Sequence, residues 1–96
     1  MTSKQRSYLK GLAMTTEPLF QIGKGSVTPE FIEAIREAFN TRELLKITVL
    51  KNCMDDPREI ASVVADRTGS VVVQVIGKKI VLYKQDKDKP RIMLPK

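Results

Sequence analysis

The 96-residue sequence predicts a single α/β domain in which three helices pack against a mixed four-stranded sheet. Helix-start signals occur three times, at Thr2, Thr28 and Asp56, and short apolar or alternating runs lie between them. Gly77 and Lys78 lie between the last two runs, which is typical of a tight hairpin. This order of elements requires two right-handed crossovers followed by a hairpin. With 42% hydrophobic residues, the chain can build one core but not two.

The first predicted helix begins at a capping box, formed by Thr2 and Gln5, and runs to about Ala13. At 100° per residue, Arg6 and Lys10 lie one turn apart on its polar side. Its apolar stripe consists of Tyr8, Leu9, Leu12 and Ala13. Arg6 and Lys10 are therefore expected to be available to a ligand.

After Pro18, residues 19–22 read as a short strand that leads into a glycine loop. The loop consists of Gly23, Lys24, Gly25 and Ser26. Its glycines allow sharp turns and close approach, its lysine is cationic, and the next helix directs free N–H groups toward the same place. These features indicate a phosphate-binding loop, although a simple turn would have the same pattern. Because Thr28 stands where a third glycine would fall in a dinucleotide motif, binding of ATP or a dinucleotide is disfavoured.

The second predicted helix has Thr28 as its N-cap and Pro29 at its first position, and it continues to about Asn40. Its inward residues are Phe31, Ile32, Ile35, Ala38 and Phe39. Its outer face carries Glu30, Glu33 and Glu37. Since carboxylates repel phosphate, a nucleic acid should meet the N-terminal tip of this helix and avoid its flank.

Residues 44–50 form the second predicted strand, because Leu45, Ile47 and Val49 alternate with polar residues. Asp56 then starts a third helix, which ends near Gly69. Two apolar runs follow, at residues 71–76 and 80–83, and both are predicted to be interior strands or nearly so.

The turn between these two strands places Lys78 and Lys79 at one end of the sheet. The predicted domain covers residues 1–84. Residues 85–96 alternate in charge and contain two prolines, so they are expected to form a flexible, basic tail.

The net charge of +6 is unevenly distributed along the chain. Residues 1–29 sum to +3 and residues 67–96 to +6, whereas residues 30–66 sum to −3. A folded domain with segregated charge can present one basic face, which attracts polyanions by releasing their counterions. RNA, DNA and an anionic membrane would all suit such a face, and a basic surface that only aids solubility is the alternative.

The residue types argue against several other classes of function. The chain has one cysteine, Cys53, and no histidine, so neither an internal disulfide nor a Cys/His metal site is expected. Cys53 is expected to be a partly buried structural thiol. Residues 1–10 are polar, and no apolar run approaches about 20 residues. We expect a soluble, cytoplasmic monomer that is not an enzyme and needs no cofactor.

Four separated blocks carry a family resemblance from Leu9 to Tyr83. They read Leu9-Lys10-Gly11-Leu12-Ala13, Ile22-Gly23-Lys24-Gly25, Glu43-Leu44-Leu45-Lys46-Ile47 and Gln74-Val75-Ile76-Gly77-Lys78-Lys79-Ile80-Val81-Leu82-Tyr83. With these blocks, the sequence resembles the CRM family, named for chloroplast RNA splicing and ribosome maturation. It is most similar to the small bacterial stand-alone members, the YhbY-like proteins.

The resemblance implies an RNA-binding domain related in fold to the C-terminal domain of translation initiation factor three. It also implies that a GxxG loop forms part of the RNA surface and that the protein associates with precursors of the large ribosomal subunit. One position departs from the family's usual Gly-Lys-x-Gly loop, because Ser26 occupies the last glycine position. The Ser26 hydroxyl can donate to a phosphate, but its side chain restricts the left-handed backbone that glycine allows.

The predicted RNA surface combines the resemblance with the charge pattern. The loop residues Gly23, Lys24, Gly25 and Ser26 would hold one phosphate, Arg6 and Lys10 would contact the adjoining backbone, and Lys78 and Lys79 would extend the track. Since the chain has five aromatic residues and no Trp, recognition should depend on backbone and shape, with weak sequence specificity. The alternative function is a protein-binding adaptor in ribosome assembly or translation, which contacts ribosomal proteins through the acidic helix face.

Overall fold

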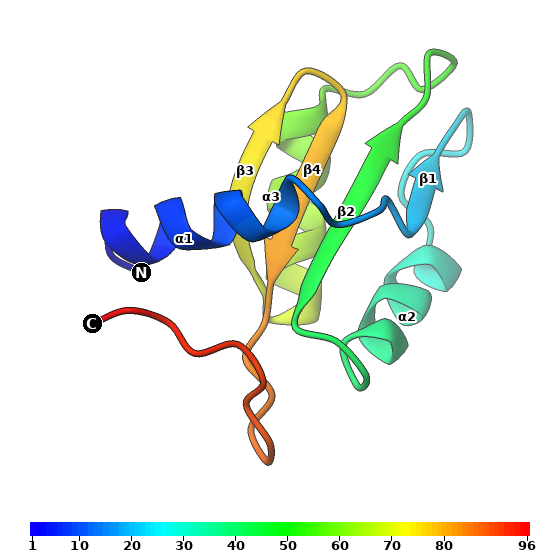
Figure 1. Cartoon of the computed structure of the whole chain (residues 1–96). Helices are drawn as coiled ribbons and strands as arrows, with labels where there is room; N and C mark the ends of the chain where they lie inside the picture. Colours follow the sequence, from blue (N-terminus) through cyan, green and yellow to red (C-terminus); the bar gives the residue numbers. More distant parts are fainter.

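The protein forms a three-layer α/β domain, described here over residues 1–96 by a computed structural model (Figure 1). The elements in chain order are α1 (Ser3–Ala13), β1 (Phe20–Ile22), α2 (Pro29–Ala38), β2 (Leu44–Val49), α3 (Pro57–Thr68), β3 (Val71–Ile76) and β4 (Lys79–Tyr83). The strands form one four-stranded sheet in the order β1-β2-β4-β3. The predicted fold class is therefore confirmed. None of the three helices has the length and apolar character that crossing a membrane requires.

The sheet is mixed, as predicted. β1 lies parallel to β2, and β4 pairs antiparallel with both β2 and β3. α2 connects the parallel strands β1 and β2, and α3 connects β2 to β3 at the far edge of the sheet. β4 then returns through a tight turn and fills the space between β2 and β3, with Leu82 opposite Leu45 on one side and Val72 on the other.

The prediction that β3 and β4 are both interior strands is right for β4 and wrong for β3, which is an edge strand. The apolar run of β3 has another cause. Val73 packs on the α1 side, whereas Val72 and Val75 pack on the opposite side, against the cluster under α2 and α3. An apolar run indicates that both faces of the strand are covered by other side chains. It does not show whether the strand lies at the edge of the sheet.

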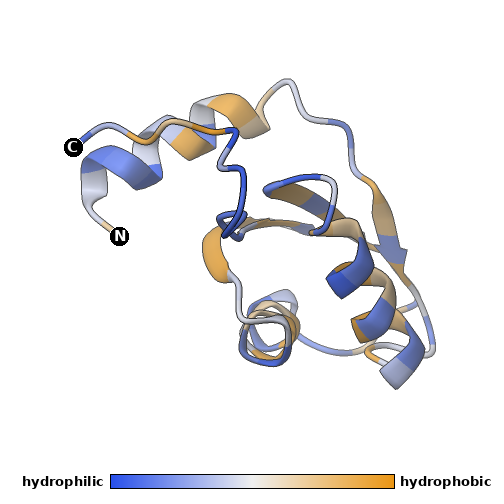
Figure 2. Ribbon diagram, turned by 90° about the horizontal axis from the view of Figure 1, so that it is seen from below, coloured by the Kyte–Doolittle hydropathy of each residue, from blue (hydrophilic) through white to orange (hydrophobic).

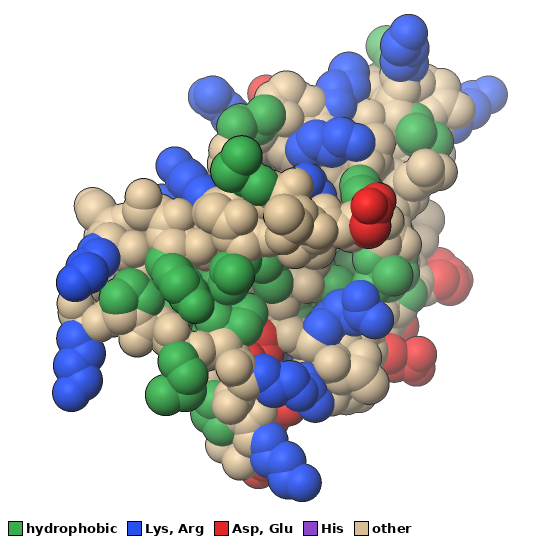
Figure 3. Space-filling view, in the orientation of Figure 1, with side chains coloured by type: hydrophobic (Ala, Val, Ile, Leu, Met, Phe, Trp, Pro, Cys, Tyr) green, Lys and Arg blue, Asp and Glu red, His purple; other side chains and the backbone are tan.

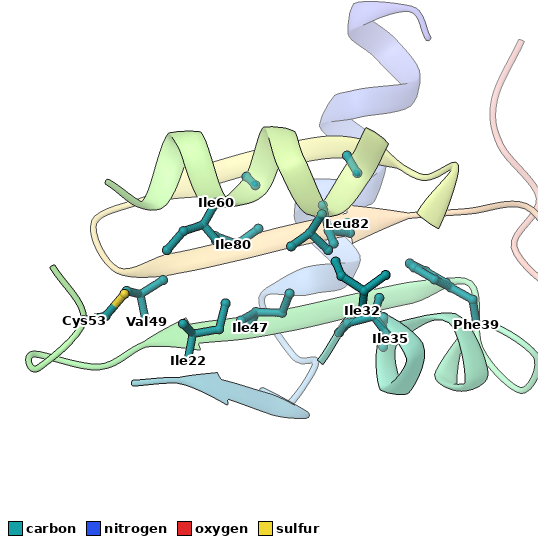
Figure 4. Packing of buried hydrophobic residues seen from close by; sticks show 14 residues of the cluster. Ile22, Ile32, Ile35, Phe39, Ile47, Val49, Cys53, Ile60, Ile80 and Leu82 are labelled. Carbon is teal, nitrogen blue, oxygen red and sulfur yellow. The ribbon is translucent and has the colours of Figure 1, made fainter. Parts of the chain in front are cut away.

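The helices divide unequally between the two faces of the sheet (Figure 2). α2 and α3 cover one face, where 14 buried residues form the main cluster and Ile47, Ile80 and Leu82 lie at its centre (Figure 4). α1 crosses the other face alone, over a smaller cluster of six buried residues that includes Leu9 and Val81. One face is thus fully covered, and part of the other is left open.

The helix ends follow the capping signals in the sequence. The Thr2 hydroxyl accepts the N–H of Gln5 at 3.1 Å, and the Gln5 side chain accepts the N–H of Thr2 at 3.0 Å. Thr28 caps α2 by accepting the N–H of Phe31 at 3.1 Å. α3 ends at Gly69, whose φ of +68° is the left-handed conformation that favours glycine.

The C-terminal segment contains no helix or strand, but it is anchored to the domain by Glu43, which is only 2% exposed. One carboxylate oxygen of Glu43 accepts the N–H of Asp86 at 2.7 Å, and the other accepts those of Arg91 and Ile92 at 2.7 and 2.6 Å. Ile92 and Leu94 pack against the α1 cluster. The flexibility expected for residues 85–96 stays a prediction, and these contacts hold the segment across the domain.

Candidate nucleic-acid interface

Three connections meet at one end of the sheet: the loop after β1, the loop after β2 and the turn between β3 and β4 (Figure 1). Backbone hydrogen bonds hold them side by side. The N–H of Val49 donates to the carbonyl of Lys78 at 2.7 Å, and the N–H of Leu50 donates to the carbonyl of Ile22 at 2.8 Å. The glycine loop and the Lys78 turn are distant in sequence, and the end of β2 joins them into one surface.

The glycine loop is a tight turn closed by the N–H of Ser26, which donates to the carbonyl of Gly23 at 3.0 Å. The backbone N–H groups of Lys24 and Gly25 have no partner within the chain. A β-carbon on Gly23 would lie 3.2 Å from the side-chain oxygen of Asn52, so the glycine lets the next loop approach closely without a shift of that side chain. Two successive free N–H groups beside a lysine are a suitable arrangement for a phosphate.

Ser26 adopts the left-handed conformation, with a φ of +52°, although it is not a glycine. This conformation costs a non-glycine residue about 1–2 kcal/mol. The Ser26 hydroxyl donates to the carboxylate of Asp55, which lies in the loop after β2. The hydroxyl expected to donate to a phosphate is therefore bound to a carboxylate in the free protein, and the negative charge of Asp55 lies beside the loop.

Six lysines carry the positive charge of this end and of the adjoining open face. Lys24, Lys51 and Lys78 lie in the three connections, and Lys10, Lys46 and Lys79 lie on α1, β2 and β4. The only ion pairs in the chain are Arg36–Glu33 at 3.0 Å and Arg91–Asp86 at 4.0 Å. None of the six lysines is neutralised by a carboxylate. In Figure 3, Lys and Arg side chains gather over the upper end of the molecule.

Lys46 and Lys79 are placed on the open face because successive side chains of a strand point to opposite faces of the sheet. Lys46 and Lys79 point away from the main cluster, and Lys10 approaches them from α1. The ammonium group of Lys46 donates to the carbonyl of Ala13 at 3.0 Å, at the C-terminal end of α1 where the helix dipole favours a cation. That of Lys79 donates to the hydroxyl of Thr48 at 2.9 Å.

Arg6 is the predicted site residue whose surroundings differ most from the expectation. Its guanidinium Nη1 donates to the carbonyls of Val72 and Val73, at 2.7 and 2.9 Å. These carbonyls lie where an extra residue interrupts the pairing of β3 with β4, a β-bulge that leaves backbone groups without ladder partners. Arg6 thus ties α1 to β3, and this nitrogen is not free for a ligand.

The structure brings together the glycine loop and Lys78 at the sheet end, with Lys79 and Lys10 on the adjoining face. Sequence reasoning missed Lys46 and Lys51. Lys46 could have been found from the alternation in β2, because it lies on the polar side of that strand. Lys51 follows the strand without a pattern, and only the fold shows that it lies between the other two connections.

The acidic side chains of α2 lie elsewhere. Glu30, Glu33 and Glu37 are exposed on α2, as the sequence predicted, and the fold places α2 on the far side of the sheet from α1. No group of three or more His, Cys, Asp or Glu side chains is placed to hold a metal ion. Cys53 is buried in the main cluster.

Comparison with known proteins identifies the family of this arrangement. A family model for the CRS1/YhbY (CRM) domain matches residues 1–84. The chain belongs to the CRM domain family. Its similarity to a curated relative, the probable RNA-binding protein YqeI of Bacillus subtilis, is 42% identity over 95 residues, which cover 99% of each chain.

Two further comparisons agree with this assignment. An RNA-binding protein of Haemophilus influenzae is 30% identical over 96 residues, which cover all of this chain and 96% of the relative. The solution structure of the hypothetical protein SAV1595 from Staphylococcus aureus has a TM-score of 0.83 and 43% identity, over 99% of each chain. This solved structure therefore shares the fold along nearly the whole length of the chain.

Proposed function

We propose that this CRM domain binds RNA, and that it docks on the ribosomal RNA backbone in precursors of the large ribosomal subunit. The observation that carries the proposal is the convergence of six lysines without carboxylate partners on one sheet end and the face beside it. Such a surface gains free energy by releasing the counterions condensed on a polyanion. The relatives named as RNA-binding proteins support RNA as that polyanion.

Within this surface, the glycine loop is the proposed contact for one phosphate. The unpaired N–H groups of Lys24 and Gly25 would donate to phosphate oxygens, and the Lys24 ammonium would supply charge. Asp55 limits the approach on the Ser26 side, so the phosphate is expected at the opposite side of the loop. Lys51 and Lys78 would follow the backbone away from it.

The role at the large ribosomal subunit rests on the family resemblance in the sequence, and the shape of the surface is compatible with it. The chain has no Trp to stack on bases, and its cations are spread over two adjoining sides. Folded RNA offers phosphates in fixed positions, which lysines held on one folded domain can match without reading the sequence.

The first test is a salt titration of binding to a structured ribosomal RNA fragment, measured by fluorescence anisotropy. Each lysine that neutralises a phosphate should contribute about 0.7 to 0.9 to the slope of log K against log salt. We expect the slope to fall by that amount for Lys24→Ala and for Lys78→Ala. Arg42→Ala is the matched control, because Arg42 is an exposed, unpaired cation that precedes the other end of β2. Unchanged slopes for both lysine variants would exclude these two phosphate interactions.

The second test addresses the ribosomal target by co-sedimentation with ribosomal particles on a sucrose gradient. Wild type should travel with the large-subunit precursors, and the Lys10→Ala/Lys24→Ala variant should stay at the top. If both travel equally with the particles, another surface, such as the acidic flank of α2, makes the contact. If neither does, the ribosomal target is wrong, whereas the anisotropy experiment still decides on RNA binding.

A further inference from the structure

The open face of the sheet contains a hollow that phosphate binding does not explain. It lies between the C-terminal half of α1 and the strands β3 and β4. Ala13 and Val81 form its buried floor, and the exposed side chains of Met14 and Ile76 form its walls. A surface that only tracks a backbone has no need of an apolar depression, since phosphates and riboses do not fill one.

The rim of the hollow is polar and cationic. Lys10, Lys46 and Lys79 line it, together with the half-buried Gln74. Lys46 and Lys79 each make one hydrogen bond inside the protein, whereas the Gln74 amide makes none and is free to offer one donor and one acceptor side. Gln74 is also the single polar residue in the otherwise apolar strand β3. Its amide is the group that could read the edge of a ligand.

The size of the hollow limits what can fill it. Its volume is about 140 Å³. An engineered apolar cavity of about 150 Å³ in another protein binds benzene, so the space suits one six-membered ring. A two-ring purine would project beyond it. The apolar floor favours the ring faces, and the flexible thioether of Met14 can adapt to them.

We propose that this hollow takes an unpaired pyrimidine base of the bound RNA, with its ring over Val81, its edge on the Gln74 amide and its phosphates on Lys10 and Lys79. This inference rests on the proposed RNA binding and adds a single-stranded element to it. The base would be held by apolar contact and hydrogen bonding rather than by aromatic stacking, because no aromatic side chain lines the hollow. An RNA with a bulged or looped pyrimidine beside a helix would satisfy both surfaces.

The test compares three labelled single-stranded RNAs of eight nucleotides with equal charge: oligouridine, oligoadenosine and an oligomer of abasic ribose. Wild type should bind oligouridine about three- to tenfold more tightly than the abasic oligomer, the range that one hydrogen bond supplies. Oligoadenosine should bind less tightly than oligouridine, because a purine projects beyond the hollow. Gln74→Ala should reduce the preference, because only the apolar contact remains, whereas Gln21→Ala should keep it in full, because Gln21 is exposed on β1, outside the hollow.

Each other outcome overturns the inference in a distinguishable way. Equal binding of all three oligomers would reject the base site and leave backbone binding intact. If no RNA binds, including the structured fragment, the proposed function itself fails. Equal reductions in affinity from Gln74→Ala and Gln21→Ala would show a general effect of the sheet surface.

A second measurement needs no variant and so does not depend on how Gln74→Ala folds. In NMR spectra of the wild type, oligouridine should shift the side-chain amide of Gln74 and the methyl groups of Val81, and the abasic oligomer should not. Uridine monophosphate alone should shift them only at much higher concentration. If uridine monophosphate binds as tightly as oligouridine, RNA is rejected as the source of the base. If oligouridine leaves the Gln74 and Val81 resonances unchanged, the site itself is rejected.

Discussion

The two faces of the sheet are built from alternate residues of the same strands, yet they have different tasks. In β2, Leu45, Ile47 and Val49 enter the main cluster under α2 and α3, whereas Lys46 and Thr48 point to the open face. One face is closed by two helices and the other is only partly covered by one. The difference shows how a domain of 96 residues keeps a stable core and a binding surface on one sheet.

The largest effect on stability should come from a substitution in the main cluster, on the face of the sheet that α2 and α3 cover. Ile47→Ala removes a fully buried side chain from the main cluster and should lower the free energy of unfolding by about 2–5 kcal/mol, as measured by urea denaturation. The control is Lys46, the preceding residue, whose side chain lies on the open face. Lys46→Ala should lower stability by less than about 1.5 kcal/mol and weaken RNA binding instead. Equal decreases in stability would contradict the division between the faces.

The next effect concerns the anchor of the C-terminal segment. Glu43→Gln keeps one acceptor oxygen but turns an NH₂ group toward a backbone N–H, so it should cost about 1–3 kcal/mol of unfolding free energy. Urea denaturation of this variant and of a chain lacking residues 87–96 provides the check. The two decreases in stability should add only in part when combined, because both changes disturb the hydrogen bonds from Arg91 and Ile92 to Glu43, whereas the bond from Asp86 remains in the shortened chain. Full additivity would show that the anchor is not shared.

The same carboxylate predicts a pH dependence. Burial would raise the pKa of Glu43, but the backbone N–H groups of Asp86, Ile92 and Arg91 outweigh burial and lower that pKa. A lowered pKa in the folded state means that the stabilisation is present above the unfolded pKa, about 4.3 to 4.5, and disappears as the pH falls through the folded value. Urea midpoints measured from pH 6 to pH 3 should therefore fall less steeply for Glu43→Gln than for wild type.

The smallest effect should come from Ser26→Gly in the glycine loop. Glycine relieves the left-handed backbone at a φ of +52°, but it removes the hydrogen bond to Asp55, so stability should change by less than about 1 kcal/mol. RNA binding should become slightly tighter, because the loop is then no longer held by the hydrogen bond to Asp55. Asp55→Asn is the companion variant, and it should tighten binding by removing the charge. Weaker binding by both variants would show that the Ser26–Asp55 pair supports RNA binding.

Much of the fold could be predicted from the sequence, because its signals are local. Capping residues at Thr2 and Thr28 and the glycine after α3 define helix ends within a few residues along the chain. The order of elements predicted the mixed sheet, and the residues of the glycine loop predicted a phosphate-binding turn, while the family resemblance added RNA as the expected ligand. The edge position of β3 was not predictable from its apolar run, because lateral pairing leaves no pattern in the composition of a strand.

The candidate site was less predictable, because it depends on which segments the fold brings together. Arg6 has the spacing of an exposed helix residue, and only the bulge in β3 explains why its guanidinium is turned inward. In the sequence, Lys51 is an isolated lysine. It joins the other lysines only in the folded domain, where the ends of β1 and β2 lie side by side. In the sequence, Glu43 is only the residue before a strand. Its role as an anchor depends on residues 43 to 49 positions further along the chain, whose N–H groups donate to it in the folded domain.

The position of β4 has a consequence for how the chain folds during its synthesis. The last strand to be made occupies the space between β2 and β3, so neither of those strands has its full set of partners until residue 83 has left the ribosome. The contacts of β4 with β3 are local, but those with β2 are long-range and late, and long-range contacts are the ones that slow folding. A nascent chain stopped before β4 should remain an open, protease-sensitive intermediate, and the domain should form in one step when the final hairpin emerges.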